Sequence, residues 1–178
     1  MKLFNVAAVV ISMSVSAMTF AQIENETTKY SIKLNQVVVN SDTLDSVDDI
    51  TTVGFASSSM IDNNFFIEGQ IDKSISKANG EDQPDWENAE FDLINFGIFA
   101  GYLSNSTGRK FTRARVGLAH SRINLSHKEV SWLKETESST DLAVGFASGI
   151  YLLDGSSFSL EFNAYGDKLF SFGATYSF

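Results

Sequence analysis

The chain has 178 residues, with 22 acidic against 13 basic side chains, a formal net charge of -9 at neutral pH and no cysteine. Nucleic acid is bound through clustered Lys and Arg, so this charge balance argues against a nucleic-acid partner. A chain without cysteine has no disulfides, thiolate metal sites, thiol nucleophiles or lipid-modified N-terminal cysteine. The length suits one domain.

The N-terminus carries the pattern of a secretory signal. Lys2 precedes an uncharged stretch at 3–21, which ends with Thr19 and Ala21 at the small-residue positions of a signal-peptidase site. A membrane-spanning helix is the alternative, but the apolar core is short, and a polar segment rather than a basic cluster follows it. We therefore predict a signal peptide at 1–21 and one domain at 22–178, with no transmembrane helix.

Three segments of the N-terminal half, at 29–39, 50–60 and 64–75, alternate with a period of two, which is typical of two-faced strands. One face is apolar: Tyr30, Ile32, Leu34, Val38, Val53, Phe55, Phe65, Ile67, Ile71 and Ile75. The other face is mainly small or polar: Ser31, Lys33, Asn35, Val37, Gly54, Ala56, Phe66, Glu68, Gln70, Asp72 and Ser74.

Five segments of the C-terminal half repeat this alternation more cleanly, at 91–104, 111–125, 140–153, 157–166 and 169–178. Their apolar faces are rich in Phe, Ile, Leu and Val and include Ile98, Leu118, Phe146, Phe162 and Phe172. Their opposite faces hold polar side chains and glycines: Gly97, Gly101, Gly117, Gly145, Gly149 and Gly173. The total of eight strands is even, as a closed antiparallel barrel requires.

The connections between these strands alternate in length. Short, turn-rich joints at 61–64, 105–110 and 154–157 fall on one side, and long segments at 40–49, 76–90 and 126–139 fall on the other. Only 166–168, on the long side, is brief. Outer-membrane barrels have this asymmetry, with tight periplasmic turns and long outer loops.

The chemistry of the two strand faces indicates whether the barrel lies in water or in a membrane. A soluble barrel of the lipocalin kind would turn its apolar face inward around a ligand. Eight strands enclose only a narrow lumen, so we place the small, polar face inside and the Phe-rich face against lipid. An open sheet edge in lipid would leave backbone groups unpaired, so the sheet is expected to close.

The last strand carries a motif that points to a known family. Residues 171–178 read polar, any, Gly, any, any, aromatic, any, aromatic, and end on Phe178. This resembles the terminal signal that the barrel assembly machinery recognises, carried here by Gly173, Tyr176 and Phe178. Residues 27–178 resemble the opacity/OmpA-type eight-stranded outer-membrane barrels, most specifically in the terminal strand and in the segments 96–105 and 113–121.

The resemblance implies a location and an environment. We expect export through the periplasm to the outer membrane of a Gram-negative cell, with outer-membrane lipid and lipopolysaccharide around the barrel, and a monomer.

Seven charged residues are expected to point into the lumen: Lys33, Glu68, Asp72, Arg113, Arg115, Asp141 and Glu161. Asn35, Gln70, Asn95, Asn163 and Tyr165 lie between them. Unpaired charges are costly in a narrow lumen, so we expect Arg113 and Arg115 to bridge to Glu68, Asp72 or Glu161 as a polar plug. The alternative is a narrow, porin-like channel for ions or small solutes, in which the ion pairs rearrange.

The long loops are acidic, with carboxylates at Asp42, Asp45, Asp48, Asp49, Glu81, Asp82, Asp85, Glu87, Glu90, Glu129, Glu135 and Glu137. Such loops could gather divalent cations near lipopolysaccharide or steer a basic surface partner. No spaced ligand run defines a metal site, so solvated loops are the simplest interpretation. Trp86 and Trp132, in the same loops, suit anchoring at the bilayer surface or contact with a partner.

Catalysis has little support in the sequence. The two histidines, His120 and His127, are each beside a serine, but neighbours in a strand point to opposite faces, and nothing orients His127 in its loop. We expect no enzyme, no cofactor and no metal site. The sequence thus predicts an all-β protein, an eight-stranded antiparallel transmembrane up-and-down barrel with a structural or surface-interaction role in adhesion or envelope integrity.

Overall fold

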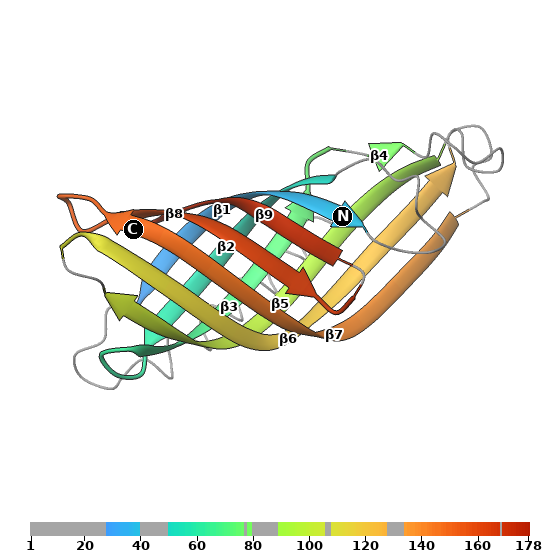
Figure 1. The fold of residues 1–178 in the computed structure, drawn as a ribbon. Helices are drawn as coiled ribbons and strands as arrows, with labels where there is room; N and C mark the ends of the chain where they lie inside the picture. The colour runs from blue at the N-terminus through green and yellow to red at the C-terminus, as the bar shows by residue number, and fades with distance from the viewer. Residues whose placement is uncertain are drawn as a thin grey trace.

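The computed structural model describes residues 28–39, 50–76, 78–79, 89–105, 108–127, 134–167 and 169–178. Its strands are β1 (Lys29–Val39), β2 (Ile50–Met60), β3 (Phe65–Ser74), β4 (Ala78–Asn79), β5 (Ala89–Asn105), β6 (Lys110–His127), β7 (Lys134–Tyr151), β8 (Ser157–Tyr165) and β9 (Leu169–Ser177). They form one antiparallel sheet in the order β3-β2-β1-β9-β8-β7-β6-β5-β4, which the pairing of β3 with β5 closes into a barrel (Figure 1). Eight strands make the wall, as predicted, and the two-residue β4 adds to one side of β5.

The first and last wall strands meet in a fully paired seam. The backbone N–H of Tyr30 donates to the carbonyl oxygen of Phe178 at 3.1 Å, and the N–H of Phe178 donates back to Tyr30 at 2.9 Å. In hydrocarbon, every backbone group needs a partner within the protein, and closure supplies it. No helix in the described part of the chain is long and apolar enough to cross a membrane.

The β2–β3 and β7–β8 connections are tight turns, and both lie at the end of the barrel where Tyr30 pairs with Phe178. We call this end the turn end. In the β2–β3 turn, the backbone N–H groups of Asn64 and Phe65 each donate to Asp62 Oδ1 at 2.8 Å, which lowers the pKa of the Asp62 carboxyl. In the β7–β8 turn, the Ser156 hydroxyl and backbone N–H bond to Asp154 Oδ1 at 2.6 and 3.0 Å and lower its pKa in the same way. Side chains that bond their own backbone two or three residues on are typical of such turns.

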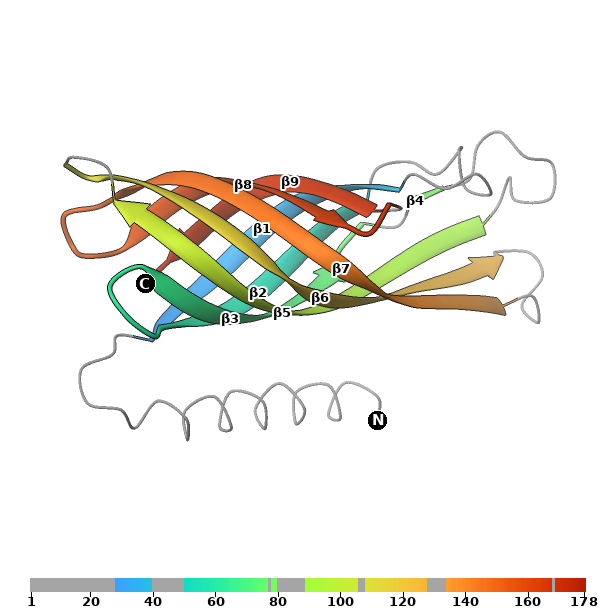
Figure 2. The same ribbon diagram turned by 60° about the horizontal axis from the view of Figure 1, so that its bottom comes forward.

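At the opposite end, the loop end, three strands are much longer than the rest. β5, β6 and β7 have 17, 18 and 18 residues, while the other wall strands have 9 to 11. Figure 2 shows these three strands running past the ends of β8 and β9. The prediction of a loop over 126–139 was therefore wrong at both ends, because β6 continues to His127 and β7 begins at Lys134. Part of the predicted 76–90 loop is likewise strand, in β4 and the start of β5.

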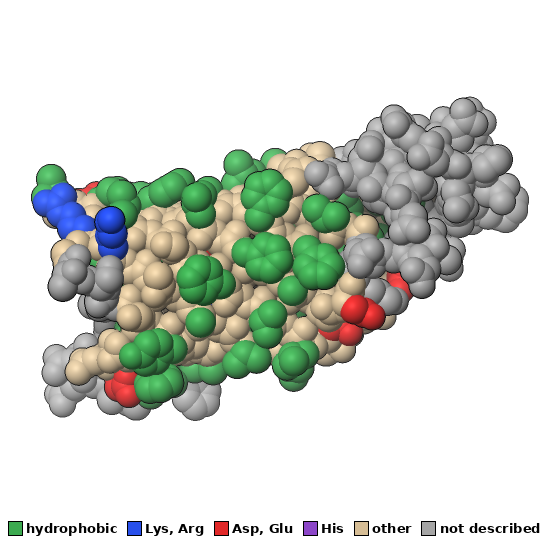
Figure 3. Space-filling view, in the orientation of Figure 1, with side chains coloured by type: hydrophobic (Ala, Val, Ile, Leu, Met, Phe, Trp, Pro, Cys, Tyr) green, Lys and Arg blue, Asp and Glu red, His purple; other side chains and the backbone are tan. Residues whose placement is uncertain are grey.

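The outer face of the barrel is apolar, as the alternation predicted. Ile98 is 72% exposed, Leu160 64%, Leu118 61% and Phe172 60%. Figure 3 shows apolar side chains spread over the middle of this wall, with the acidic side chains that are visible lying toward its ends. Exposed apolar surface on this scale is unfavourable in water and suits hydrocarbon.

The interior has two chemically different halves. Toward the turn end it holds buried polar and charged side chains, as expected. Toward the loop end it holds an apolar cluster: Val37, Val39, Ile50, Phe91, Leu93, Phe99, Ala119, Ala143, Tyr165 and Leu169. The expectation of a small, polar interior is therefore only partly correct, because large apolar side chains such as Ile50, Phe91 and Leu93 also fill the lumen.

Candidate functional site

Five charged side chains from four strands meet in the polar half of the lumen. Lys33 comes from β1, Glu68 from β3, Arg113 and Arg115 from β6, and Glu161 from β8. All five occupy the inward-facing positions of their strands, and all but Arg113 are less than a tenth exposed. We call these five residues the lumen cluster.

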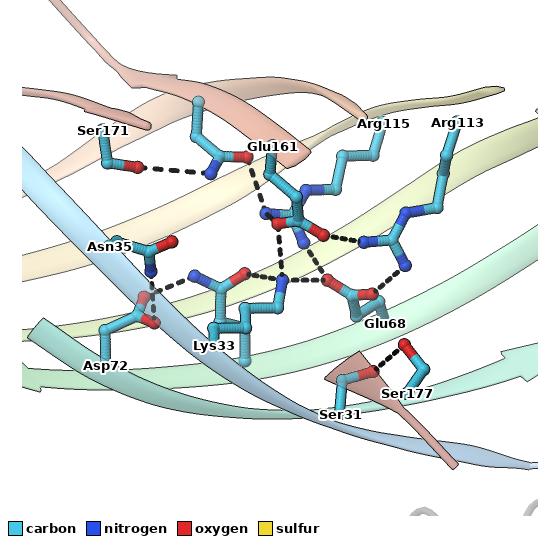
Figure 4. Close-up of polar contacts among 12 residues, drawn as sticks. Ser31, Lys33, Asn35, Glu68, Asp72, Arg113, Arg115, Glu161, Ser171 and Ser177 are labelled. Atoms are coloured by element: carbon cyan, nitrogen blue, oxygen red, sulfur yellow. Dashed lines mark hydrogen bonds and ion pairs between the residues drawn. The ribbon is translucent and has the colours of Figure 1, made fainter. Parts of the chain in front are cut away.

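Each carboxylate of the lumen cluster contacts all three cations (Figure 4). Lys33 Nζ lies 3.1 Å from both Glu68 Oε1 and Glu161 Oε2, and it donates to Gln70 Oε1 at 2.9 Å. Arg113 Nη1 lies 2.8 Å from Glu68 Oε2, and its other terminal nitrogen bonds Glu161. Arg115 bonds Glu68 through Nη1 and lies 3.4 Å from Glu161 through Nη2.

Neighbouring aromatic rings and small residues hold the two arginines in place. The Arg115 guanidinium lies 4.3 Å from the centre of the Phe99 ring, and Arg113 lies 5.4 Å from that of Phe66. A cation over a ring face is attracted by the ring's quadrupole. Gly145 leaves the space that Arg115 occupies, since a Cβ there would come within 2.7 Å of Arg115 Nε.

Asp72 and Asp141 lie apart from the lumen cluster. Asp72 is buried, and it accepts from the side-chain amides of Gln70, Asn35 at 3.4 Å and Asn95 at 3.3 Å rather than from an arginine. Asp141 is half-buried nearer the loop end, beside Gly166. Of the three acids expected to bridge to Arg113 and Arg115, the structure thus brings Glu68 and Glu161 to them and leaves Asp72 in an amide network.

The lumen has almost no free volume where the amide network around Asp72 meets the apolar cluster. A cavity of about 10 Å³ lies between them, lined by Asn35, Val37, Thr52, Asp72, Leu93, Asn95, Tyr165, Leu169 and Ser171. Such a volume fits about one water molecule. The described side chains therefore close the lumen twice, first by ion pairs and then by apolar packing.

The apolar closure was only partly visible in the sequence. Val37 and Tyr165 were expected on the inward face, but Ile50, Phe91 and Leu93 were not identified as lumen residues. The period-two pattern could have found Leu93, because it is two residues from the inward Asn95.

Gly173 and Tyr176 of the terminal motif lie on the seam strand β9, and Phe178 directly follows it. Tyr176 and Phe178 are 41% and 54% exposed on the outer face, with their ring centres 6.1 Å apart. Gly173 lies on the inner face, where a Cβ would overlap the carbonyl oxygen of Leu34 on β1. Gly173 thus has a packing reason to be glycine, and its part in assembly stays a prediction.

The described residues offer no catalytic pair at the histidines. His120 is exposed, and its Nδ1 lies 2.9 Å from Thr140 Oγ1. Ser121 is buried on the opposite face and donates to Asn95 Oδ1 at 3.1 Å. The side chain of His127 lies outside the described residues.

Most of the acidic loop residues, and both Trp86 and Trp132, also lie outside the described part of the chain. Glu137 is described and is exposed on β7. Among the described residues, no group of three or more His, Asp or Glu side chains is arranged to hold a metal ion.

The closed eight-stranded sheet, its apolar exterior and its filled lumen make this chain an outer-membrane β-barrel. Solved structures that share this fold include three bacterial surface proteins. The attachment invasion locus protein Ail of Yersinia pestis aligns with a TM-score of 0.59 and 17% identity, over 88% of this chain and 100% of that one. Neisserial surface protein A aligns with a TM-score of 0.63 and 11% identity, over 86% and 97%.

The outer membrane protein OprG of Pseudomonas aeruginosa aligns with a TM-score of 0.55 and 11% identity, over 86% of this chain and 97% of that one. These alignments confirm the resemblance to eight-stranded outer-membrane barrels at the level of the fold. No family model matches the sequence, and no curated protein matches it.

Proposed function

We propose that this barrel is a membrane anchor for a surface-interaction role, such as adhesion or envelope integrity, and that its lumen does not conduct. The observation that carries this proposal is the double closure of the lumen, by the lumen cluster and by the apolar cluster beyond it. A permeating ion would have to break buried ion pairs and also displace well-packed apolar side chains, and both steps are costly.

A narrow channel is the alternative that the charged lumen residues suggest, and conductance separates the two. Purified protein in planar bilayers should give no stable conductance steps under an applied voltage. A variant with Phe91→Ala and Leu93→Ala loses part of the apolar cluster but keeps the lumen cluster, so it should also give no stable steps. Stable unitary steps from the unmodified protein would contradict the plugged lumen and favour the channel.

The surface role is supported by the loop end. Three long strands project there, and the connecting segments are rich in carboxylates. Ail has been crystallised in complex with sucrose octasulfate, a heparin analogue and a polyanion. The acidic segments of this chain favour the opposite charge, so its surface partner is expected to be basic.

Binding to intact cells or to their extracts tests the surface role. Unmodified protein in nanodiscs should capture a partner, and variants with 40–49 or 80–88 replaced by short Gly-Ser linkers should capture less. Equal capture by all variants would contradict a role for these segments.

Lipid A from cells with and without the protein should give the same mass spectrum, and an acyl-chain difference would indicate an enzyme instead.

A further inference from the structure

One stretch of β7 lacks a neighbouring strand on one side. β7 pairs with β6 from Lys134 to Ile150, but it pairs with β8 only from Ala143 to Tyr151. Among the described residues, 134–142 therefore have a strand neighbour on the β6 side alone. We call residues 134–142 the β7 edge, and Figure 2 shows it as the part of β7 that runs beyond β8 and β9.

The backbone groups on this open side can be assigned. The N–H of Gly166 donates to the carbonyl oxygen of Leu142 at 2.8 Å, so the backbone groups of Leu142 point away from β6. Along an antiparallel strand this direction alternates with each residue. The N–H and C=O groups of Thr140, Ser138 and Thr136 therefore also point away from β6, and no backbone partner for them occurs among the described residues.

The β7 edge lacks the proline or bulge that interrupts many sheet edges, although it has charged side chains, which also protect edges. Natural edges are kept short or are interrupted by proline or by a bulge. This edge contains no proline, and its register with β6 is unbroken from Lys134 opposite Ser126 to Leu142 opposite Leu118. Its exposed side chains at Thr136, Ser138 and Thr140 are hydroxylic, so it offers a regular backbone template without an apolar surface that would aggregate.

Charge selects the occupant of the β7 edge. The stretch contains three acids and one lysine, and Glu137 and Asp141 fall on the same face of the strand. A second copy pairing antiparallel around Glu137 would set Glu137 opposite Glu137, and around Ser139 it would set Glu137 opposite Asp141. Like charges directly opposite each other destabilise a strand pair, so a second copy is disfavoured and a basic strand is favoured.

We propose that the β7 edge binds an extended, Lys- or Arg-bearing segment of another protein by strand addition. The backbone of the added segment pairs with Thr136, Ser138 and Thr140, and its alternate basic side chains face Glu137 and Asp141. Main-chain bonds supply affinity in such complexes, and alternate side chains supply specificity. This inference deepens the proposed surface role and rests on it, because it names the chemistry of the partner and the place where it binds.

Synthetic peptides test the inference with the full barrel in nanodiscs. The probe is an alternating Thr-Lys peptide of about eight residues, a typical strand length. It should bind at least about tenfold more tightly than a Thr-Glu peptide of the same length. Glu137→Gln with Asp141→Asn should remove most of that preference. No detectable binding of the Thr-Lys peptide, or equal binding of the two peptides, would overturn the proposal.

Backbone chemistry separates strand addition from simple attraction to an acidic surface. Ser138→Pro removes one edge-facing N–H and should weaken binding about tenfold, whereas Ser138→Thr keeps the N–H and should bind as the unmodified protein does. The barrel should fold in both variants, because an edge strand tolerates proline where its N–H points out of the sheet.

N-methylation of the peptide gives a readout that needs no protein variant. Methyl groups on one alternate set of peptide nitrogens should abolish binding, and methyl groups on the other set should not, since only one set faces the β7 edge. Equal effects of both sets, or unchanged binding by Ser138→Pro, would overturn strand addition while leaving the surface role standing. A dimer of the unmodified protein that Ser138→Pro dissociates would show that a second copy is the occupant and would also overturn the proposal.

Discussion

Glu68 and Glu161 are the residues whose charges the lumen cluster can least do without. These two carboxylates face three cations, and each of them contacts all three. Removing one member of a buried ionic network is costly mainly because the remaining charges lose their partners. Loss of a carboxylate and loss of a cation therefore have unequal effects. Losing a carboxylate leaves three cations against one acid, whereas losing Lys33 leaves two arginines matched by two carboxylates.

The first prediction compares these two losses. Glu161→Gln should lower the free energy of unfolding by about 3–5 kcal/mol, and Lys33→Met should cost clearly less, because Arg113 and Arg115 still neutralise Glu68. Urea titration of the refolded protein in lipid vesicles measures both values. A cost for Lys33→Met equal to that of Glu161→Gln would contradict this charge balance.

A second residue-scale prediction concerns close backbone approach between β5 and β6. A Cβ at Gly117 would overlap the carbonyl oxygen of Ile98, whereas nothing lies within 4 Å of a Cβ at Gly69. Gly117→Ala should therefore destabilise the barrel by about 1–3 kcal/mol. Gly69→Ala is the matched control and should be neutral or stabilising by about 0.5–1 kcal/mol, since glycine is entropically unfavourable in a strand. Equal losses in the same urea titrations would show that the close approach has no cost.

Among the elements, β9 contains most of the predicted assembly motif and also closes the barrel. Phe178, directly after β9, pairs with Tyr30 through its backbone and exposes its ring on the outer face. On β8, Phe158 is 43% exposed on the same outer face, opposite Tyr176 in the register. The two rings thus meet similar surroundings, but only Phe178 belongs to the terminal motif.

The third prediction separates assembly from lipid contact. Phe178→Ser and Phe158→Ser should each lose about 2 kcal/mol of apolar contact with lipid. Only Phe178→Ser should reduce, several-fold, the amount of heat-modifiable protein in the outer membrane of cells that make it. If the two variants reach the membrane in equal amounts, the terminal aromatic has no special part in insertion.

The elements also show where a sequence pattern stops being informative. Within the membrane, the strand alternation is sharp because one face meets hydrocarbon and the other meets the lumen. Toward the loop end, side chains on both faces of β7 are exposed at 136–138 and 140, and the segment 134–141 contains only polar and charged residues. The pattern therefore looks like a loop although the strands continue, and only the register with the neighbouring strand decides it.

At the scale of the whole molecule, the apolar exterior favours insertion of the barrel into a bilayer. Leu160 lies in the middle of β8 and is 64% exposed, whereas Thr136 is exposed on the part of β7 beyond β8. An arginine at position 160 would face lipid, and an arginine at position 136 would face water. An arginine is costly at the middle of a bilayer and nearly neutral in water.

The fourth prediction follows from that contrast. Leu160→Arg should lower the free energy of unfolding in lipid vesicles by about 2–4 kcal/mol. Thr136→Arg should change it by no more than about 0.5 kcal/mol. Comparable effects at both positions, or a refolded protein that stays soluble without detergent or lipid, would contradict a lipid-facing exterior.

The alternation along the strands was enough to assign most side chains to the outer or the inner face, because a period of two requires no knowledge of partner strands. It also placed Lys33, Glu68, Arg113, Arg115 and Glu161 on the inward face. Which of these side chains meet depends on the fold, since Lys33 and Glu68 are 35 residues apart and their contact depends on how strands shift along one another around the barrel. The same shift placed Asp72 among amides and left the β7 edge without a strand beside it.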